Sequence, residues 1–290
     1  MKLSEIFAQK KLTLSFEVFP PKTGDAYESV REATEQIARI NPDFMSVTYG
    51  AGGGTSAYTV QIAKNLLAQS VTPLAHLTCV SSDRAQIRQA LDNLRQSGIE
   101  NVLALRGDIP KDAPPSDAWA YHYASELVEE IRNYGGFCIG GACYPEGHVE
   151  SASLKEDLLH IKQKVDAGCE FLTTQMFFDN NILYRFLYQA REAGITVPIV
   201  AGIMPVTNAK QIKRICSLSG TYLPRRFVSI VDKFGNSPDA MAQAGIAYAT
   251  EQIIDLYANG VNNVHVYSMN KPEIAYRIKE SLSAIIGQEL

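Results

Sequence analysis

A carboxyl group stands inside an apolar run near the start of the chain, where Glu17 occupies the centre of SFEVF. Burial disfavours the charged form of a carboxyl group, so we expect the pKa of this side chain to be raised. An acid with a raised pKa can donate a proton near neutral pH. The structural alternative for the same residue is a buried ion pair with Arg106.

Polar side chains also stand in or just after most of the other apolar runs. They are Thr48, Tyr49, His76, Thr78, Arg106, Asp108, Tyr144, Glu146, His148, Gln175, Asp179, Tyr267 and Asn270. Because buried polar groups cost free energy unless they are paired, their repetition at corresponding places predicts a large polar ligand.

Several of these residues also have a plain structural interpretation. His76 is compatible with a hydrogen-bonded core histidine, and Asp108 is compatible with a turn residue after Gly107. The glycine-rich run Gly50–Gly54 is compatible with a phosphate cradle, but it lacks the spacing and the terminal lysine of a P-loop.

The elements that must position these side chains alternate along the chain. Apolar runs typical of strands cover residues 12–18, 44–48, 74–79, 101–105, 137–144, 171–176, 198–203 and 264–267. Amphipathic stretches typical of helices cover residues 25–40, 56–70, 83–97, 120–134, 153–167, 181–193, 208–219, 238–259 and 272–285. Strict alternation predicts parallel strands joined by crossover helices.

Eight such units fit a closed (β/α)8 TIM barrel better than an open sheet. We therefore expect a single α/β domain over residues 1–290, with extra helices near the C-terminus. The interval 204–263 is longer than one unit, and residues 223–233 are the expected extra element. Because active sites of these barrels lie at the carboxyl ends of the strands, the polar residues named above are predicted to share one rim.

The composition excludes several classes of protein. Charged residues make up 20% of the chain, hydrophobic residues make up 46%, and the net charge is −4. The sequence contains no basic stripe of the kind that indicates a nucleic-acid partner. Five cysteines without a CxxC pair argue against a zinc site and a disulfide framework. The chain shows neither a signal-peptide core nor an apolar stretch of about 18 residues, so we expect a cytoplasmic protein without a membrane partner.

Ten segments together resemble one enzyme family. They are LSFEVFPPK (14–22), FMSVTYGAGG (44–53), PLAHLTC (73–79), VLALRGDIP (102–110), YASELV (123–128), ACYPEGH (142–148), DLLHIKQKVDAG (157–168), TTQMFFD (173–179), GIMPVTNAKQI (202–212) and VHVYSMNK (264–271). In this order the chain resembles the methylenetetrahydrofolate reductases of the bacterial type, which consist of the catalytic domain alone.

The resemblance implies a (β/α)8 barrel that holds FAD at the carboxyl rim of its strands. It implies reduction of 5,10-methylenetetrahydrofolate to 5-methyltetrahydrofolate by a ping-pong reaction. A reduced nicotinamide, NADH or NADPH, gives hydride to the flavin and leaves, and the folate then takes its place. We also expect a homo-oligomer, and an electron-transfer partner subunit is a second source of electrons in this family.

The resemblance also assigns residues. Glu17 stands at the position of the family's catalytic acid, and Asp108 at that of a carboxylate that meets the pterin and tunes the flavin. The positions that contact folate are Gln175, Gln211, Ile215, Tyr267 and Lys271. The positions that contact FAD are Thr48, Tyr49, His76, Leu77, Arg106, Gly107, Asp108, Tyr123, Ala124, Ala142, Tyr144, His148, Asp157, His160 and Lys164.

Four positions depart from the family pattern. Ile215 replaces a phenylalanine that touches both nicotinamide and folate, and Lys271 replaces an arginine, which loses a two-pronged donor. On the FAD side, His160 and Gln163 replace an asparagine and an arginine. These departures bear on the electron donor and on the nucleotide contacts.

Two other functions remain open from the residues. A metal-dependent barrel hydrolase or lyase would use His76, Asp108 and His148, although their spacing matches no established metal motif. A non-catalytic subunit would bind flavin and receive electrons from a partner protein. A yellow protein indicates flavin, whereas a colourless protein with stoichiometric zinc would favour the hydrolase.

Overall fold

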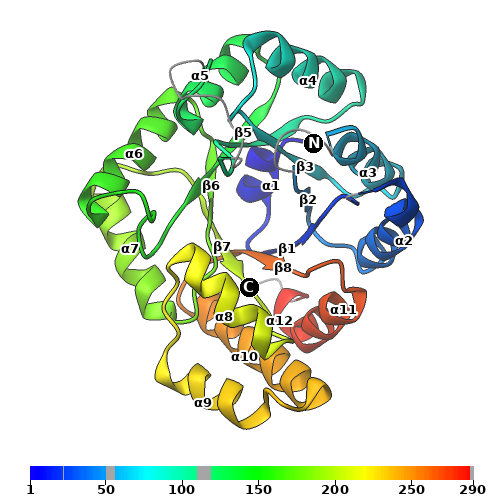
Figure 1. The fold of residues 1–290 in the computed structure, drawn as a ribbon, viewed down its shortest axis with the longest axis vertical. Coiled ribbons are helices and arrows are strands. Elements are labelled where there is room, and N and C mark those ends of the chain that lie inside the picture. Colours follow the sequence, from blue (N-terminus) through cyan, green and yellow to red (C-terminus); the bar gives the residue numbers. More distant parts are fainter. Residues whose placement is uncertain (22, 50–55, 110–118, 288–290) are drawn as a thin grey trace.

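The expected apolar runs all form strands in the computed structural model, which describes residues 1–21, 23–49, 56–109 and 119–287. The strands are β1 (Thr13–Val18), β2 (Met45–Val47), β3 (Pro73–Thr78), β4 (Asn101–Leu105), β5 (Cys138–Cys143), β6 (Phe171–Thr174), β7 (Ile199–Ile203) and β8 (Asn263–Tyr267). Each strand pairs in parallel with the next, and β8 pairs with β1, which closes the barrel (Figure 1). The predicted (β/α)8 architecture is therefore confirmed.

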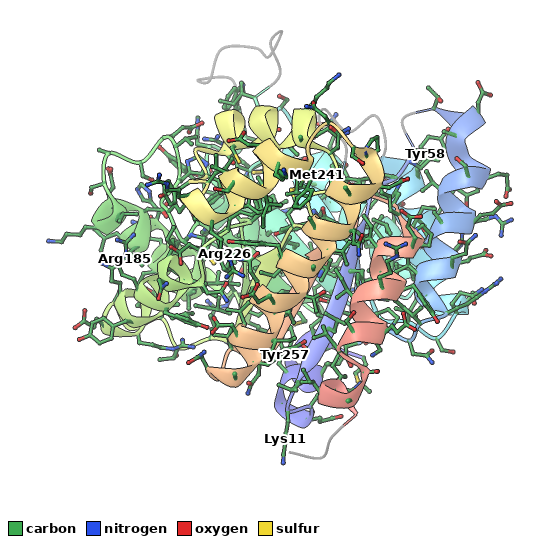
Figure 2. The ribbon with its side chains drawn as sticks, turned by 90° about the horizontal axis from the view of Figure 1, so that it is seen from below. Lys11, Tyr58, Arg185, Arg226, Met241 and Tyr257 are labelled. Carbon is green, nitrogen blue, oxygen red and sulfur yellow. The ribbon has the colours of Figure 1, made fainter. Side chains whose placement is uncertain are left out.

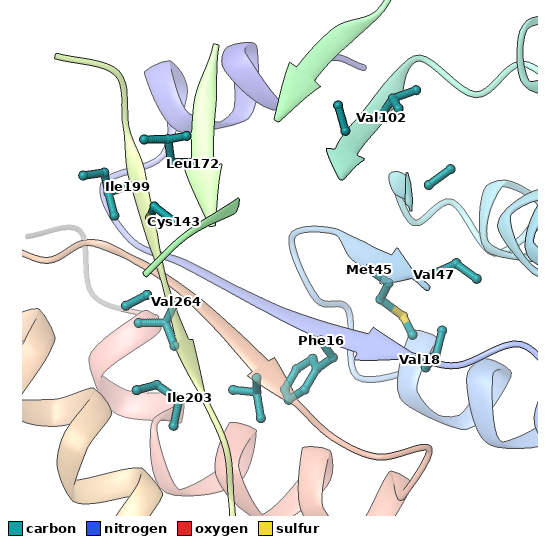
Figure 3. Packing of buried hydrophobic residues seen from close by; sticks show 14 of the residues in the cluster. Phe16, Val18, Met45, Val47, Val102, Cys143, Leu172, Ile199, Ile203 and Val264 are labelled. Carbon is teal, nitrogen blue, oxygen red and sulfur yellow. The ribbon is translucent and has the colours of Figure 1, made fainter. Parts of the chain in front are cut away.

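Both faces of the strands are buried, which explains why the strands read as continuous apolar runs. In β1 the side chains of Leu14, Phe16 and Val18 belong to the hydrophobic core between the barrel wall and the helices (Figure 3). Successive side chains of a strand point to opposite faces, so Ser15 and Glu17 point into the barrel. The polar residues of β1 are thus interior residues.

The helices follow the expected alternation. They are α2 (Tyr27–Ala38), α3 (Ser56–Ala68), α4 (Arg84–Gln96), α5 (Ala124–Tyr134), α6 (Leu154–Ala167), α7 (Asn180–Glu192), α8 (Ala209–Ser219), α9 (Arg225–Phe234), α10 (Pro238–Ala258), α11 (Pro272–Ser281) and α12 (Ser283–Ile286), with a short 3₁₀ helix at Gly24–Ala26. Figure 1 shows α2 to α7 around the barrel in chain order. The expected helix over residues 272–285 is divided between α11 and α12, and the helix expected from residue 120 begins at Ala124.

One helix was not expected from the sequence. Helix α1 (Leu3–Gln9) lies across one end of the barrel, where Leu3 and Ile6 pack against the interior side chains Phe44 and Phe171 (Figure 1). The ring of Phe7 contacts the same two rings edge-on, with centroids 6.0 and 5.4 Å away. This helix seals the end of the barrel at which the strands begin.

The extra element expected over residues 223–233 is α9, which lies outside the ring of helices (Figure 1). The ring of Phe227 in α9 stacks on Phe178 at 5.0 Å. Helix α10 follows and extends from Met241 at one end of the molecule to Tyr257 near the other, where Lys11 also lies (Figure 2). Within the described residues, the long interval before β8 therefore holds α9 and α10 in addition to α8.

The glycine-rich run at residues 50–54, considered above as a phosphate cradle, falls outside the described residues. In the part of the chain that the structure describes, no helix is long and apolar enough to cross a bilayer.

Candidate active site

Glu17 lies at the carboxyl end of β1, next to Ser46 of β2 and Tyr267 of β8 in the parallel register. Glu17 is only 7% exposed, although a glutamate side chain is normally charged in water. Nε2 of His76, on β3, lies 3.7 Å from Oε2 of Glu17, and His76 is 8% exposed. Three strands therefore enclose one carboxyl group.

Burial moves the pKa values of this pair in opposite directions. Desolvation raises the pKa of Glu17 to about 8. Desolvation lowers the pKa of His76 to about 4. Near neutral pH the site therefore holds a carboxylic acid beside a neutral imidazole, which is the arrangement of a proton donor.

Beneath Glu17 lies a polar layer that was missed from the sequence. His265 of β8 is 2% exposed and contacts the hydroxyl groups of Ser15 and Ser46 at 2.7 and 2.8 Å. The three residues occupy inward positions of their strands, where aliphatic side chains usually fill a barrel. These residues could have been found from the sequence as polar residues at the inward-facing, alternate positions of otherwise apolar strands.

A cleft of about 500 Å³ opens above Glu17, and we call it the Glu17 cleft. The residues that line it include Glu17, Phe19, His76, Leu103, Asp108, Ala142, Tyr144, Gln175, Met176, Met204, Ile215, Tyr267 and Met269. Three of the predicted folate positions are therefore brought together with the predicted acid, namely Gln175, Ile215 and Tyr267. The hydroxyl of Tyr267 donates to the Thr174 carbonyl oxygen at 2.6 Å, which fixes the ring against β6.

A second cleft of about 660 Å³ adjoins the first, and we call it the Arg106 cleft. It contains most of the predicted FAD positions, namely Tyr49, Arg106, Gly107, Asp108, Tyr123, Ala124, Ala142, Tyr144, His148, Asp157, His160 and Lys164. Asp108, Ala142 and Tyr144 line both clefts, so a ligand in one would reach a ligand in the other.

Arg106 does not pair with Glu17, so the ion pair considered from the sequence is wrong. Both terminal nitrogens of its guanidinium bind the carboxylate of Glu150, at 2.6 and 2.7 Å. The planar guanidinium matches two carboxylate oxygens, which makes this a two-point contact. Arg106 is thus held at the wall of its own cleft, and Glu150 is a lining residue that the sequence did not reveal.

Buried ionisable groups lie deeper in the Arg106 cleft. The ammonium of Lys164 donates to the carbonyl oxygen of Ala142, and burial lowers the pKa of Lys164. Burial raises the pKa of Asp157, whose carboxylate accepts a hydrogen bond of 3.2 Å from Ser151. An ammonium has three donors, so Lys164 retains capacity for a bound anion.

Four predicted contact positions lie outside both clefts. Leu77 lines a neighbouring cleft between α3 and α4, together with His76. The backbone oxygen of Thr48 accepts from the Thr59 hydroxyl. Gln211 is exposed in the first turn of α8, and Lys271 donates to the Thr207 hydroxyl at 2.9 Å. Neither Gln211 nor Lys271 lines the Glu17 cleft.

The residues considered for a metal site do not form one. Across residues 1–21, 23–49, 56–109 and 119–287, no three His, Cys, Asp or Glu side chains gather closely enough to hold a metal ion. His76, Asp108 and His148 all belong to these ranges. The arrangement therefore favours proton donation beside a large cleft.

Comparison with known proteins points in the same direction. The family model described as methylenetetrahydrofolate reductase matches residues 2–283. A 5,10-methylenetetrahydrofolate reductase of Pectobacterium carotovorum subsp. carotovorum is 35% identical over 275 residues, which cover 94% of this chain and 91% of that protein. The protein of the same description from Escherichia coli (strain K12) is 34% identical, over 96% of this chain and 93% of that protein.

Longer and more distant proteins also match. Methylenetetrahydrofolate reductase (NADH) 1 of Arabidopsis thaliana is 35% identical over 98% of this chain, which spans only 50% of that plant protein. A solved structure, described as an uncharacterized protein from Clostridium thermocellum that binds two copies of 5-methyl-5,6,7,8-tetrahydrofolic acid, superposes with a TM-score of 0.68. It is 15% identical and covers 98% of this chain and 100% of its own, so it supports the fold alone.

Proposed function

The chain belongs to the methylenetetrahydrofolate reductase family and is an oxidoreductase, and we propose that it reduces 5,10-methylenetetrahydrofolate to 5-methyltetrahydrofolate with FAD as the hydride carrier. The observation that carries this proposal is the pair of adjoining clefts. The protonated Glu17 lies on the floor of one cleft, most of the predicted FAD positions line the other, and Asp108 lines both.

The residues of the Arg106 cleft fit a flavin nucleotide. Arg106 and the buried Lys164 are cations suited to the charged groups of FAD. Gly107 has φ of +88°, and a Cβ there would lie 2.9 Å from Cβ of Thr78, so only glycine forms this part of the wall. Among the described residues, Nε2 of His76 is buried without a hydrogen-bond partner, and we propose that bound FAD supplies one.

We propose that FAD, when bound, accepts hydride from a reduced nicotinamide and passes it to the folate. The chain's own contribution begins with Glu17, whose carboxyl proton opens the bridging methylene ring of the folate by protonating a ring nitrogen. Burial keeps this carboxyl neutral near pH 7, since its pKa is about 8. Glu17 therefore stays protonated near neutral pH and can donate its proton.

Other residues of the Glu17 cleft orient the substrate. We propose that Gln175 contacts the pterin, and its Oε1 accepts from the backbone amide of Met176 at 3.0 Å. This bond leaves the amide NH₂ as a donor. Asp108 supplies an acceptor at the junction of the two clefts. We propose that this pair fixes the pterin over the flavin position.

The electron donor acts in the first half-reaction, which reduces the flavin. We propose NADH or NADPH, which would enter the same cleft before the folate. Ile215, Met176 and Met204 give one wall of that cleft an apolar surface for a nicotinamide ring. A partner protein is the second candidate donor. The expectations of a single catalytic domain, a homo-oligomer and a cytoplasmic location stay predictions.

An anaerobic stopped-flow experiment on the purified chain tests the proposal. The protein is expected to be yellow, with flavin absorbance near about 450 nm. That absorbance should bleach with NADH or NADPH and return when 5,10-methylenetetrahydrofolate is added, with 5-methyltetrahydrofolate as the product. Parallel double-reciprocal plots would support the ping-pong order. Bleaching by reduced ferredoxin alone would favour a partner protein, and a chain that binds no FAD would refute the proposal.

A further inference from the structure

The polar layer below Glu17 is unusual for the interior of a barrel. Ser15 and Ser46 are fully buried, and His265 nearly so, at a level where branched aliphatic residues normally pack. The imidazole of His265 stacks on Phe44, with centroids 5.5 Å apart and planes 7° apart. Burial lowers the pKa of His265 to about 3, so this imidazole is neutral.

A neutral imidazole has one N–H donor and one acceptor nitrogen, and a hydroxyl has one proton. Oγ of Ser15 lies 3.0 Å from the carbonyl oxygen of Val264 and 2.7 Å from Nδ1 of His265. Oγ of Ser46 lies 2.8 Å from Nε2 of His265 and 3.5 Å from Oε2 of Glu17. These contacts form one chain with two possible directions.

The Val264 carbonyl decides between the two directions because it can only accept. If Ser15 donates its proton to this oxygen, Nδ1 of His265 must carry a proton and donate to Ser15. Nε2 is then the acceptor and takes the proton of Ser46. In the reverse direction, the oxygens of Ser15 and Val264 would face each other at 3.0 Å with no proton between them, which is repulsive.

In the favoured direction Ser46 has no proton left for Glu17. The oxygen of Ser46 then presents only a lone pair to Oε2 of Glu17, at 3.5 Å. A carboxylate there would face another acceptor, whereas a carboxylic acid can donate to it. Hydrogen bonding to the neutral form of an acid opposes its ionisation.

We propose that Ser15, His265 and Ser46 are positioning residues, forming a hydrogen-bond chain whose direction is set by the Val264 carbonyl and which keeps Glu17 in its protonated form. The inference deepens the proposed function, because it explains how the acid stays loaded. Ser46 is the member in contact with Glu17, and Ser15 and His265 act through it.

Other ionisable groups face Glu17 from the strands around it. They are His76 on β3, His265 and Tyr267 on β8, and Asp108 and Tyr144 across the cleft. His76 and His265 are neutral, and burial holds the pKa of Tyr267 well above its usual value. Among the described residues that line this cleft, no cation stabilises the carboxylate of Glu17. The direction of the hydrogen-bond chain is therefore the feature that a substitution can change to shift the pKa of Glu17.

The first test reads the tautomer of His265 directly. Nitrogen-15 NMR of the full chain, labelled at histidine, distinguishes Nδ1–H from Nε2–H imidazole. The His265 signal is assigned by substituting the other histidines one at a time, namely His76, His122, His148 and His160. The expected result is the Nδ1–H tautomer at neutral pH. An Nε2–H tautomer would overturn the proposal without any further variant.

The second test changes the anchor. In Ser15→Ala the Val264 carbonyl no longer sets the direction, so His265 can donate from Nε2 and Ser46 can donate to Glu17. We expect the titration midpoint of Glu17 to fall by about one pH unit. Infrared difference spectroscopy follows the protonated carboxyl band, which is identified by its loss in Glu17→Gln.

The controls separate direction from packing. Ser15→Thr keeps the hydroxyl and is expected to restore the midpoint. Thr13→Val changes the next inward residue of β1, whose hydroxyl bonds Asn263 at 2.9 Å, and should leave the midpoint unchanged. Ser46→Ala removes the acceptor that the hydrogen-bond chain offers to Glu17 and should lower the midpoint, whereas a raised midpoint would show that Ser46 donates to the carboxylate and would overturn the proposal. An unchanged midpoint in Ser15→Ala would refute the proposal.

These measurements need neither folate nor turnover, so they separate this inference from the proposed function. A protein with the expected tautomer and titration but no folate reduction would refute the proposed function. The proposal of the hydrogen-bond chain would still be supported. In an active enzyme, the alkaline limb of flavin reoxidation by folate should move to lower pH in Ser15→Ala, by the same shift. Flavin reduction by the donor should keep its rate.

Discussion

Oε2 of Glu17 lies 3.7 Å from Nε2 of His76, and the pair is a neutral acid beside a neutral base rather than an ion pair. Burial raises the pKa of Glu17 to about 8 and lowers the pKa of His76 to about 4. Near neutral pH the carboxyl of Glu17 therefore carries a proton, and the imidazole of His76 is uncharged. This relationship is what allows a glutamate to act as an acid at neutral pH.

Replacement of this acid should separate the two half-reactions. Glu17→Gln keeps the shape of the side chain but has no proton to give. Transfer from the reduced flavin to methylenetetrahydrofolate should fall at least about 100-fold, which is the usual contribution of a general acid. FAD binding and reduction of the flavin by the donor should persist. Stopped-flow measurement of each half-reaction checks this, and normal reoxidation by folate would remove Glu17 from the mechanism.

The raised pKa of Glu17 also predicts a pH-dependent stability. Between about pH 4.5 and pH 8 the folded chain binds a proton at Glu17 that the unfolded chain has lost, so stability falls as pH rises through this window. Glu17→Gln removes this dependence, and its Tm should gain on the parent chain as pH rises from about 5 to about 8. Calorimetry measures both curves. The exposed replacement Glu32→Gln is the control, and equal pH slopes for parent and Glu17→Gln would contradict the expectation.

The two-point contact of Arg106 with Glu150 predicts an effect on FAD affinity. Lysine cannot bind both carboxylate oxygens, so Arg106→Lys should release the cation from the wall of its cleft. The dissociation constant for FAD should rise about tenfold, or about 1.4 kcal/mol. Titration of the apoprotein by flavin fluorescence measures it. Arg226→Lys, in an exposed pair with Glu251, is the matched control, and equal affinities of all three proteins would argue against the contact.

The packing of α10 predicts a site that accepts only glycine. A Cβ at Gly245 would lie 1.8 Å from the carbonyl oxygen of Val206, and that atom belongs to the backbone. Gly245→Ala should therefore lower the free energy of unfolding by about 1–3 kcal/mol, although alanine is the better helix former. Ala247→Gly, on the exposed face of the same helix, should cost about 1 kcal/mol. Urea unfolding compares the free energies of unfolding of the two variants. A stabilised Gly245→Ala would show that the backbone at Val206 moves to make room for the methyl group.

Helix α1 shows where local pattern is too short to predict structure. Its seven residues, Leu3–Gln9, contain little periodicity, and a helix of this length is not stable alone. It forms because Leu3, Ile6 and Phe7 cover the open end of the barrel, beside Phe44 and Phe171. The much longer α10 was predicted because its pattern extends over several turns, whereas α9 fills the element that was expected only from the length of the interval 204–263.

The sequence by itself determined the order of strands and helices, and it placed Glu17 on a buried strand. Both follow from local rules. A strand buried on two faces is mostly apolar, and a polar residue within it costs free energy unless it is paired or has a function. It also indicated which residues would reach the rim, and most of them line the two clefts.

Only the tertiary structure decided which side chains meet. Arg106 reaches Glu150 instead of Glu17, and His265 contacts Ser15, 250 residues away along the chain. Such contacts depend on how far neighbouring strands are displaced when the barrel closes, and every strand contributes to that displacement. The residue types are local properties of the sequence, whereas the distances between them belong to the closed barrel as a whole.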